Sequence, residues 1–316
     1  MPRLPTPLTP PPDRSATRAP RRRRRDTATA WAFVAPAVIV IIGLGVVPVV
    51  WSLLLSFQAN DLVTPSRWVG LDNYRALRQD PNFHEAVRNT VVFTALYVPL
   101  SIVVGLALAL CLNRRIRFVG LYRTLFLVPF VLSATAQGVL FSFILDPEFG
   151  AANSVLHHLG VSRQGFLTDP AQALFVLVAI SLWSGTGLCT VIYLAALQDV
   201  PRELVEAAAL DGAGPPRVLR HVTLPALTPI SAFLLLWQTL QALQVFDLVY
   251  VTTKGGPLGS TTVIVYFVWE QAFKEFTAGY GAAAAYVLAV ALLAAAVAVR
   301  AVRGRARTPR TKAATP

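Results

Sequence analysis

Charged side chains are scarce in this sequence. Only 14% of its 316 residues are Asp, Glu, Lys or Arg, whereas soluble domains carry about 25%. The mean hydropathy is +0.57, and long uncharged runs produce it. A soluble protein with this composition would have to hide most of its surface. The composition therefore excludes an ordinary soluble domain and indicates that a lipid bilayer surrounds most of the chain.

Groups that drive transport or catalysis are absent from the apolar runs. These runs contain no Asp, Glu, Lys or His away from their edges, although transporters driven by protons or sodium ions usually keep an ionisable group at membrane depth. The sequence also has no G-x-x-x-x-G-K-S/T loop for ATP phosphates and no Gly-x-Ser-x-Gly nucleophile elbow. We therefore expect no enzymatic activity in this chain, and an autonomous ion-driven transporter or channel is the weaker alternative.

Cysteine and histidine are also sparse. Cys111 and Cys189 each lie inside an apolar run, where a cysteine usually acts as a small buried hydrophobe. The four histidines lie in predicted loops, and none has Cys, Asp or Glu neighbours at a spacing typical of metal ligands. The sequence therefore predicts no disulfide, no metal site and no cofactor bound by this chain.

Six apolar runs are each long enough to cross a membrane. They are Trp31–Phe57, Thr90–Leu112, Tyr122–Leu145, Leu174–Leu197, Leu227–Phe246 and Tyr280–Val299. At about 1.5 Å per residue, a helix of this length crosses a hydrocarbon core of about 30 Å. Backbone polar groups have no partner in hydrocarbon, so each run is predicted to be helical, with kinks tolerated at prolines such as Pro129. The predicted fold is an all-α integral membrane protein with six transmembrane helices.

Basic residues are distributed unevenly between the two sides of this predicted bundle. The side with both tails and the segments 113–121 and 198–226 holds 21 of the 28 basic residues, counting Arg123, but only six of the 16 acidic ones. Cytoplasmic loops carry the excess of Lys and Arg, so both termini are predicted to be cytoplasmic. The net charge of +12 is then mostly a topology signal, and we expect no nucleic-acid partner.

The chain ends have a different composition from the centre. Residues 1–28 contain many prolines and the basic run Arg21–Arg25, and such a segment buries too little apolar area to order itself. We predict a disordered cytoplasmic tail over 1–28, a membrane domain over 29–300 with a cytoplasmic loop at 198–226, and a basic cytoplasmic tail over 301–316.

The loop before the fifth run begins with the pattern of a short helix. Pro201 suits a first helical turn, and Glu203 and Glu206 favour the N-terminal half of a helix through its dipole. The alanines Ala207–Ala209 are strong helix formers. Gly212 is placed to end this helix in the left-handed conformation.

A second short helix is predicted to follow directly. Pro215 and Pro216 open it, it spans Arg217–Val222, and Leu224-Pro225 closes it before the next membrane helix. The whole loop then forms a helix-turn-helix elbow on the cytoplasmic side. An amphipathic loop lying on lipid headgroups is the alternative interpretation.

The elbow resembles the EAA loop of permeases from binding-protein-dependent ABC importers. Glu206-Ala207-Ala208, Asp211-Gly212-Ala213 and Leu224-Pro225 carry this resemblance, and Leu219 departs from it, since the family usually has Phe there. The resemblance implies that the elbow inserts into a cleft on a separate cytoplasmic ATPase, which uses ATP and Mg. The implied coupling residues are Glu206, Ala207, Ala208, Asp211, Gly212, Ala213, Leu219, Leu224 and Pro225.

Other segments resemble the sugar branch of these permeases. They are Trp68–Tyr74, Asn89-Thr90, Arg123–Phe126 and Gly255-Gly256-Pro257 followed by Thr261. The last is typical of the maltose and glycerol-phosphate type of subunit. The resemblance implies a second, different permease, a pair of ATPase subunits, an extracytoplasmic solute-binding protein and surrounding lipid as partners. It also implies a location in a bacterial cell membrane.

A few polar residues in the fourth and fifth runs are candidates for the substrate pathway. They are Ser181, Trp183, Ser184, Gly185, Gln238, Gln241 and Gln244. Amides, hydroxyls and an indole face suit a neutral sugar, and in the maltose-type family contacts fall near Gly185, Gln238 and Gln241. Hydrogen bonding between helices is the alternative role. A permease for glycerol phosphate, polyamine or peptide, and a membrane scaffold without transport, remain alternative functions.

Overall fold

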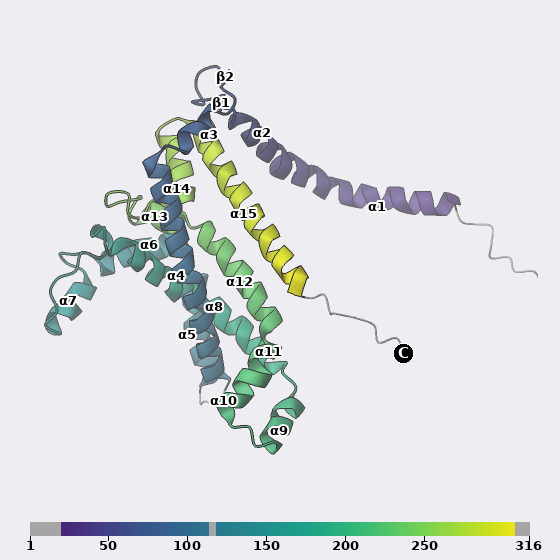
Figure 1. Ribbon diagram of the computed structural model, residues 1–316, viewed down its shortest axis with the longest axis vertical. Coiled ribbons are helices and arrows are strands. Elements are labelled where there is room, and N and C mark those ends of the chain that lie inside the picture. The colour runs from purple at the N-terminus through teal and green to yellow at the C-terminus, as the bar shows by residue number, and fades with distance from the viewer. Residues whose placement is uncertain (1–19, 114–117, 307–316) are drawn as a thin grey trace, which may run out of the picture. The chain divides into compact units, whose positions relative to one another are not determined.

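The computed structural model describes residues 20–113 and 118–306. The chain divides into two compact units, one ending at Leu54 and one running from Leu55. Helices account for most of the described chain, as Figure 1 shows. The mostly helical class predicted from the sequence is confirmed, although a small two-stranded sheet is added to it.

The N-terminal unit is one long helical stretch. Helix α1 (Pro20–Val40) continues through the π-helical segment η1 (Ile41–Val46) into α2 (Val47–Leu55). From Ala30 to Leu55 it is long and apolar enough to cross a membrane. Large side chains along it are exposed, for example Phe33 at 83% and Leu44 at 77%. A helix that is apolar on every side suits a bilayer or a protein partner within it.

Both predicted tails differ from the structure at their inner ends. Residues 20–28 were predicted to be disordered but belong to α1, since arginine is a good helix former and extends a helix that is already nucleated. Residues 301–306 belong to α15 (Ala278–Ala306). Residues 1–19 and 307–316 lie outside the described residues, so the prediction for them stays a prediction.

The chain then forms a small hairpin next to a short helix. Strand β1 (Gln58–Ala59) pairs antiparallel with β2 (Arg67–Trp68), with Gln58 opposite Trp68. Helix α3 (Asp72–Leu77) follows, and Asn73 Nδ2 donates to the carbonyls of Ser56 and Gln58 at 2.9 and 3.0 Å. This side chain joins the hairpin to α3.

Three long helices form the centre of the second unit: α4 (Pro81–Leu112), α8 (Ala173–Gln198) and α12 (Thr228–Leu243). Helix α4 packs along α8, and α12 packs against both. A Cβ added to Gly105 of α4 would overlap Cys189 of α8, so glycine permits this close approach. Cys189 is buried as predicted, whereas Cys111 is exposed on α4 and was wrongly expected inside.

The third predicted run is a broken helix rather than one straight span. Helices α5 (Val119–Val131) and α6 (Ala134–Ile144) meet at 97°, and the break lies at Leu132 and Ser133, beyond Pro129. Gln137 Nε2 donates to the carbonyls of Pro129 and Leu132 at 3.2 and 2.8 Å. An amide side chain thus satisfies backbone groups that the broken helix leaves without partners.

The remaining elements complete the unit. Helix α7 (Ala151–His158) and the 3-10 turn η2 (Phe166–Thr168) connect α6 to α8. After α12 come α13 (Asp247–Val251), α14 (Ile264–Trp269), the π-helical η4 (Glu270–Lys274) and α15.

The number of spans is only partly settled by these elements. Four helices are long and apolar enough to cross a membrane within residues 20–113 and 118–306, and α5 with α6 makes a fifth if the bent pair is one span. The apolar part of α15, Ala278–Ala294, is shorter than that length over the residues searched. Six spans with both termini in the cytoplasm therefore stay a prediction.

Candidate functional site

The predicted elbow begins with a helix that ends at a glycine. Helix α9 (Arg202–Leu210) follows Pro201, which stands just before the helix rather than inside its first turn. Gly212 has φ +78°, Ala213 N donates to Ala208 O at 2.9 Å, and Gly212 N donates to Ala209 O at 3.0 Å. This pair of bonds is a Schellman motif, and its left-handed residue strongly favours glycine. The predicted role of Gly212 in the turn is confirmed.

The second half of the elbow is longer than predicted. Helix α10 (Pro215–Val218), the π-helical η3 (Leu219–Thr223) and α11 (Leu224–Ala226) follow one another with helical backbone at each junction. The prediction that Leu224-Pro225 closes this helix is wrong. Leu224 N donates to Leu219 O, a π-helical bond, and such a widened turn accommodates the missing N–H of the proline that follows.

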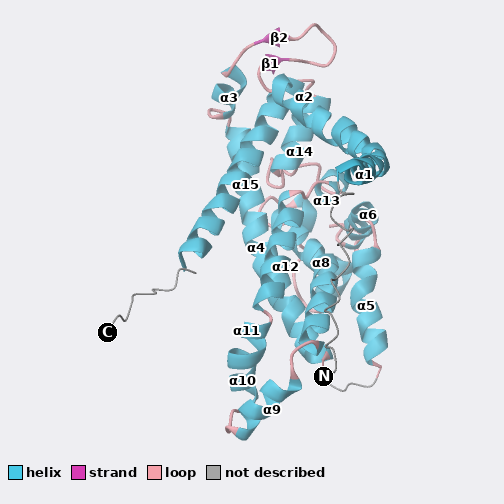
Figure 2. Cartoon of the chain, turned by 90° about the vertical axis from the view of Figure 1, so that its right-hand side faces the viewer, coloured by secondary structure: helices cyan, strands magenta, loops and turns pink. Residues whose placement is uncertain are grey.

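The elbow presents small and acidic side chains to its surroundings. Glu206, Ala207, Asp211 and Gly212 are exposed, and Leu210 is 90% exposed. Of the other predicted coupling residues, Leu224 and Pro225 are exposed, and Ala208, Ala213 and Leu219 are partly buried. Figures 1 and 2 show α9 and α10 at the opposite end of α4 from the β1–β2 hairpin. Leu210 is an apolar contact candidate that sequence reasoning missed, although its place beside Asp211 could have indicated it.

A cavity of about 250 Å³ lies between the long helices. Six of the predicted pathway residues line it: Ser181, Ser184, Gly185, Gln238, Gln241 and Gln244. The predicted role of Trp183 is not supported, since its side chain is absent from the cavity wall, is 40% exposed and packs against Phe141 at a ring distance of 5.2 Å. On a helix with 3.6 residues per turn, Trp183 lies on a different face from Ser181 and Gly185.

Other cavity residues were missed from the sequence. They include Phe93, Tyr97, Phe130, Gln137, Trp237 and Asp247. Trp237 precedes Gln238 in an apolar helix and supplies the indole that Trp183 does not. The break between α5 and α6 brings Gln137 to the cavity, and no local sequence pattern predicted that break. Among the described residues of the wall, Asp247 is the one acidic side chain, and none is Lys, Arg or His.

Tyr97, Gly185 and Gln238 meet at one side of this cavity. Gln238 Nε2 of α12 donates to Tyr97 Oη of α4 at 3.0 Å. Both side chains are largely enclosed, at 1% and 5% exposure. A Cβ added to Gly185 of α8 would overlap the Tyr97 hydroxyl. Glycine therefore makes room for this interhelical bond, and for Gln238 the alternative role of linking helices is also observed.

A second cluster of polar contacts lies in the loop of residues 252–263. Asn89 Nδ2 of α4 donates to the carbonyls of Gly259 and Thr262 at 3.0 and 3.1 Å. Thr261 is fully buried and donates to Gly256 O at 2.6 Å. Asn89 and Thr261, which carried part of the family resemblance, therefore hold this loop in one conformation.

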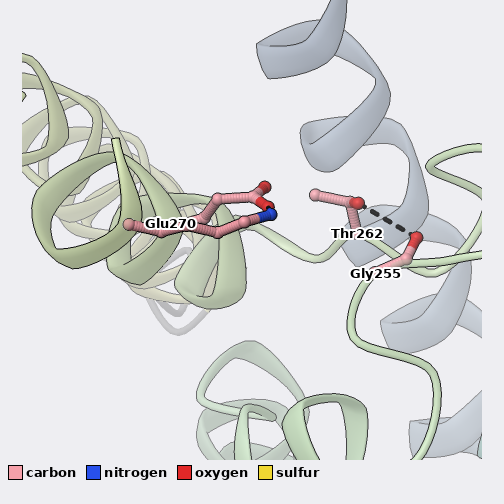
Figure 3. A network of polar contacts seen from close by, with 4 residues as sticks. Gly255, Thr262 and Glu270 are labelled. Carbon is pink, nitrogen blue, oxygen red and sulfur yellow. Dashed lines mark hydrogen bonds and ion pairs between the residues drawn. The ribbon is translucent and has the colours of Figure 1, made fainter. Parts of the chain in front are cut away.

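A cavity of about 630 Å³ adjoins the same loop. Figure 3 shows Thr262 Oγ1, which donates to Gly255 O at 3.1 Å, and the nearby Glu270. Glu270 accepts from Lys274 Nζ at 2.7 Å, and this bond raises the pKa of the lysine. The pair is solvent-exposed on the lysine side, and such pairs contribute little stability.

No group of three or more His, Cys, Asp or Glu within the described residues is arranged to hold a metal ion. The wall of the 250 Å³ cavity offers amides, hydroxyls and aromatic rings for hydrogen bonding and ring stacking. The structure is that of a polytopic membrane protein with a polar central cavity and an exposed helical elbow.

The sequence pattern of one family matches residues 91–307, and its description is "Binding-protein-dependent transport system inner membrane component". The match covers more than half of the chain, so the chain belongs to this family. It is a multi-pass membrane permease of the ABC transporter class. The family resemblance stated from the sequence is thereby confirmed.

Named relatives agree with this assignment. The sulfoquinovosyl glycerol transport permease SmoG of Agrobacterium fabrum is 34% identical, over 88% of this chain and 91% of its own length. The lactose transport permease LacF of Rhizobium radiobacter is also 34% identical, over 84% and 91%. A crystal structure of a bacterial importer of the acidic polysaccharide alginate matches with a TM-score of 0.80 at 24% identity, over 91% of this chain and 100% of that chain, and shows the same fold.

Proposed function

We propose that this chain is the permease subunit of an ATP-driven importer that translocates a sugar or oligosaccharide. An extracytoplasmic solute-binding protein delivers the ligand, a second permease completes the pathway, and two cytoplasmic ATPase subunits use ATP and Mg. The observation that carries this proposal is the exposed elbow of α9 and α10, with its left-handed Gly212, in a chain of the permease family.

The cavity supports a sugar as the substrate class. Its wall combines four glutamines, two serines and the Trp237 indole, and these groups recognise hydroxyls and the apolar face of a sugar ring. A phosphate or carboxylate would meet Asp247 there and no cationic side chain among the described wall residues. A neutral sugar therefore fits better than glycerol phosphate.

The elbow supports coupling to a separate ATPase. We propose six transmembrane helices with both termini inside, an arrangement in which residues 198–226 lie in the cytoplasm. ATP then shifts the transporter between inward- and outward-open states only through contacts that differ between those states. The elbow offers Ala207 for close approach, Leu210 as an exposed apolar contact, and Glu206 and Asp211 for polar partners.

Two substitutions in the elbow test this function. Gly212→Pro is incompatible with φ +78°, because proline requires a φ of about −65°. Glu206→Arg reverses an exposed charge without any change in packing. Both variants are expected to insert into the membrane and to lose at least 90% of sugar uptake and of sugar-stimulated ATP hydrolysis, on the order of a tenfold loss or more.

Gly214→Ala is the matched control, because Gly214 has φ −69° and a Cβ there meets only Pro216 Cδ at 3.9 Å. Its uptake is expected to be normal. Quantitative blotting of membranes and co-purification with the ATPase complete the measurement. Normal uptake by Gly212→Pro and Glu206→Arg would count against the coupling role of the elbow.

A further inference from the structure

The Tyr97 side chain is held in place although it belongs to no predicted site. It lines the 250 Å³ cavity, is 5% exposed and stacks on Phe93 at a ring distance of 5.7 Å. Its hydroxyl packs against Gly185 and accepts a hydrogen bond from Gln238 Nε2 at 3.0 Å. Three long helices, α4, α8 and α12, therefore fix the position of this one hydroxyl.

Hydrogen-bonding capacity remains on both members of the pair. Tyr97 Oη accepts from Gln238, so its own proton is available, and it has no acceptor among the described residues. Gln238 Oε1 likewise accepts no bond from them, and Gln238 lines the same cavity as Tyr97. The pair thus offers one donor and one acceptor next to the cavity.

We propose that Tyr97 is a specificity-determining residue, whose hydroxyl donates to one hydroxyl of the transported sugar while Gln238 Oε1 accepts from the same or an adjacent hydroxyl. This inference rests on the proposed function and adds a contact from α4, a helix outside the two runs assigned to the pathway from the sequence. A donor and an acceptor fixed side by side match a sugar hydroxyl, which is itself both donor and acceptor.

The same geometry explains why a deoxy sugar should be rejected. A ligand that lacks the contacted hydroxyl would leave Tyr97 Oη and Gln238 Oε1 unpaired in an enclosed site, and sites built to hydrogen-bond a hydroxyl discriminate against such analogues. A net hydrogen bond corresponds to a preference of about threefold to tenfold. Tyr97→Phe keeps the ring and its stacking but removes the donor, so this preference should disappear.

The test uses the complete transporter in proteoliposomes with its own binding protein. Lactose, maltose, cellobiose, trehalose and raffinose are tried in turn, and the sugar that stimulates ATP hydrolysis and uptake most is chosen. Uptake of this sugar is then compared with uptake of each of its monodeoxy analogues. The binding protein is the same in every sample, so its own selectivity cancels when a variant is compared with the native protein.

Tyr193→Phe is the matched control. Tyr193 Oη of α8 bonds to Ser231 Oγ of α12 at 3.0 Å, and Tyr193 is fully buried but does not line the cavity. Both variants therefore remove a tyrosine hydroxyl that links α12 to another helix. A purely structural role of Tyr97 predicts that the two variants weaken uptake of every sugar alike.

The proposal predicts a different result. In Tyr97→Phe, the ratio of uptake of the parent sugar to uptake of one monodeoxy analogue should fall by about threefold to tenfold, mainly because the KM for the parent sugar rises. Tyr193→Phe should keep the native ratio. If Tyr97→Phe retains the native preference for every analogue, the role of Tyr97 is overturned and the proposed function stands. If the ligand that drives uptake by the native transporter proves not to be a sugar, the sugar function itself is overturned, and this proposal with it.

Discussion

Replacement of Gly185 by alanine measures how tightly α8 is fitted against Tyr97. An ideal Cβ at position 185 overlaps the Tyr97 hydroxyl, and lies 3.2 Å from Tyr97 Cζ and 3.4 Å from Gln238 Nε2. Tyr97 has little space to retreat, because it is 5% exposed and stacked on Phe93. The added methyl group therefore enters occupied space.

Two effects of opposite sign decide the stability of this variant. Alanine is more favourable than glycine inside a helix by about 1 kcal/mol. Overpacking costs about 1–3 kcal/mol, and loss of the Tyr97–Gln238 bond costs about 0.5–1.5 kcal/mol. The cost exceeds the gain, so the expected net destabilisation is about 0.5–3.5 kcal/mol.

Thermal unfolding of the purified transporter in detergent, followed by size-exclusion chromatography, provides the assay. The midpoint should fall for Gly185→Ala, and should recover in the double variant Gly185→Ala with Tyr97→Phe, which no longer carries the overlapping hydroxyl. Gly120→Ala is the control, because Gly120 lies in α5 and a Cβ there meets no atom within 4 Å. Equal midpoint losses with and without the Tyr97 hydroxyl would refute the reasoning, as would a midpoint that rises for Gly185→Ala.

Two further predictions concern the helix break and the orientation of the chain. Gln137→Leu removes the side chain that donates to Pro129 O and Leu132 O. This change should lower the unfolding free energy of the transporter by about 1–3 kcal/mol. An unchanged unfolding midpoint would show that the helix break does not need this amide. In a Cys111→Ser background, Ala207→Cys should react with a membrane-impermeant maleimide only in inside-out vesicles, and Val63→Cys, in the loop beside β1, only in intact spheroplasts. The opposite pattern would place the elbow outside the cell.

Features that depend on neighbours in the chain were predictable from the sequence. The elbow is the clearest case, because Gly212 and the pair Pro215-Pro216 act through their own backbone preferences. The long apolar runs are another, since hydrocarbon permits only helices there. The polar residues of α8 and α12 could also be found, because a serine or glutamine in an apolar run is conspicuous.

The break in the third run shows where such reasoning ends. Pro129 is visible in the sequence, yet the chain bends at Leu132 and Ser133, where Gln137 reaches back to two carbonyls. Leu224-Pro225 shows the converse, because a π-helical turn carries the helix past a proline that was expected to end it. In both cases hydrogen bonds at the site decide whether the helix continues.

The sequence by itself determined the membrane character of the chain, the first helix and glycine turn of the elbow, and the polar, uncharged groups of α8 and α12, because composition and local backbone preference set all three. Only the tertiary structure decided which side chains face the central cavity. Tyr97 lines it although the sequence did not indicate this, and Trp183 does not line it although the sequence suggested that it would. Tyr97 and Gln238 are 141 residues apart, and their contact depends on a glycine in a third helix. No local pattern encodes a contact that arises only when separate helices pack together.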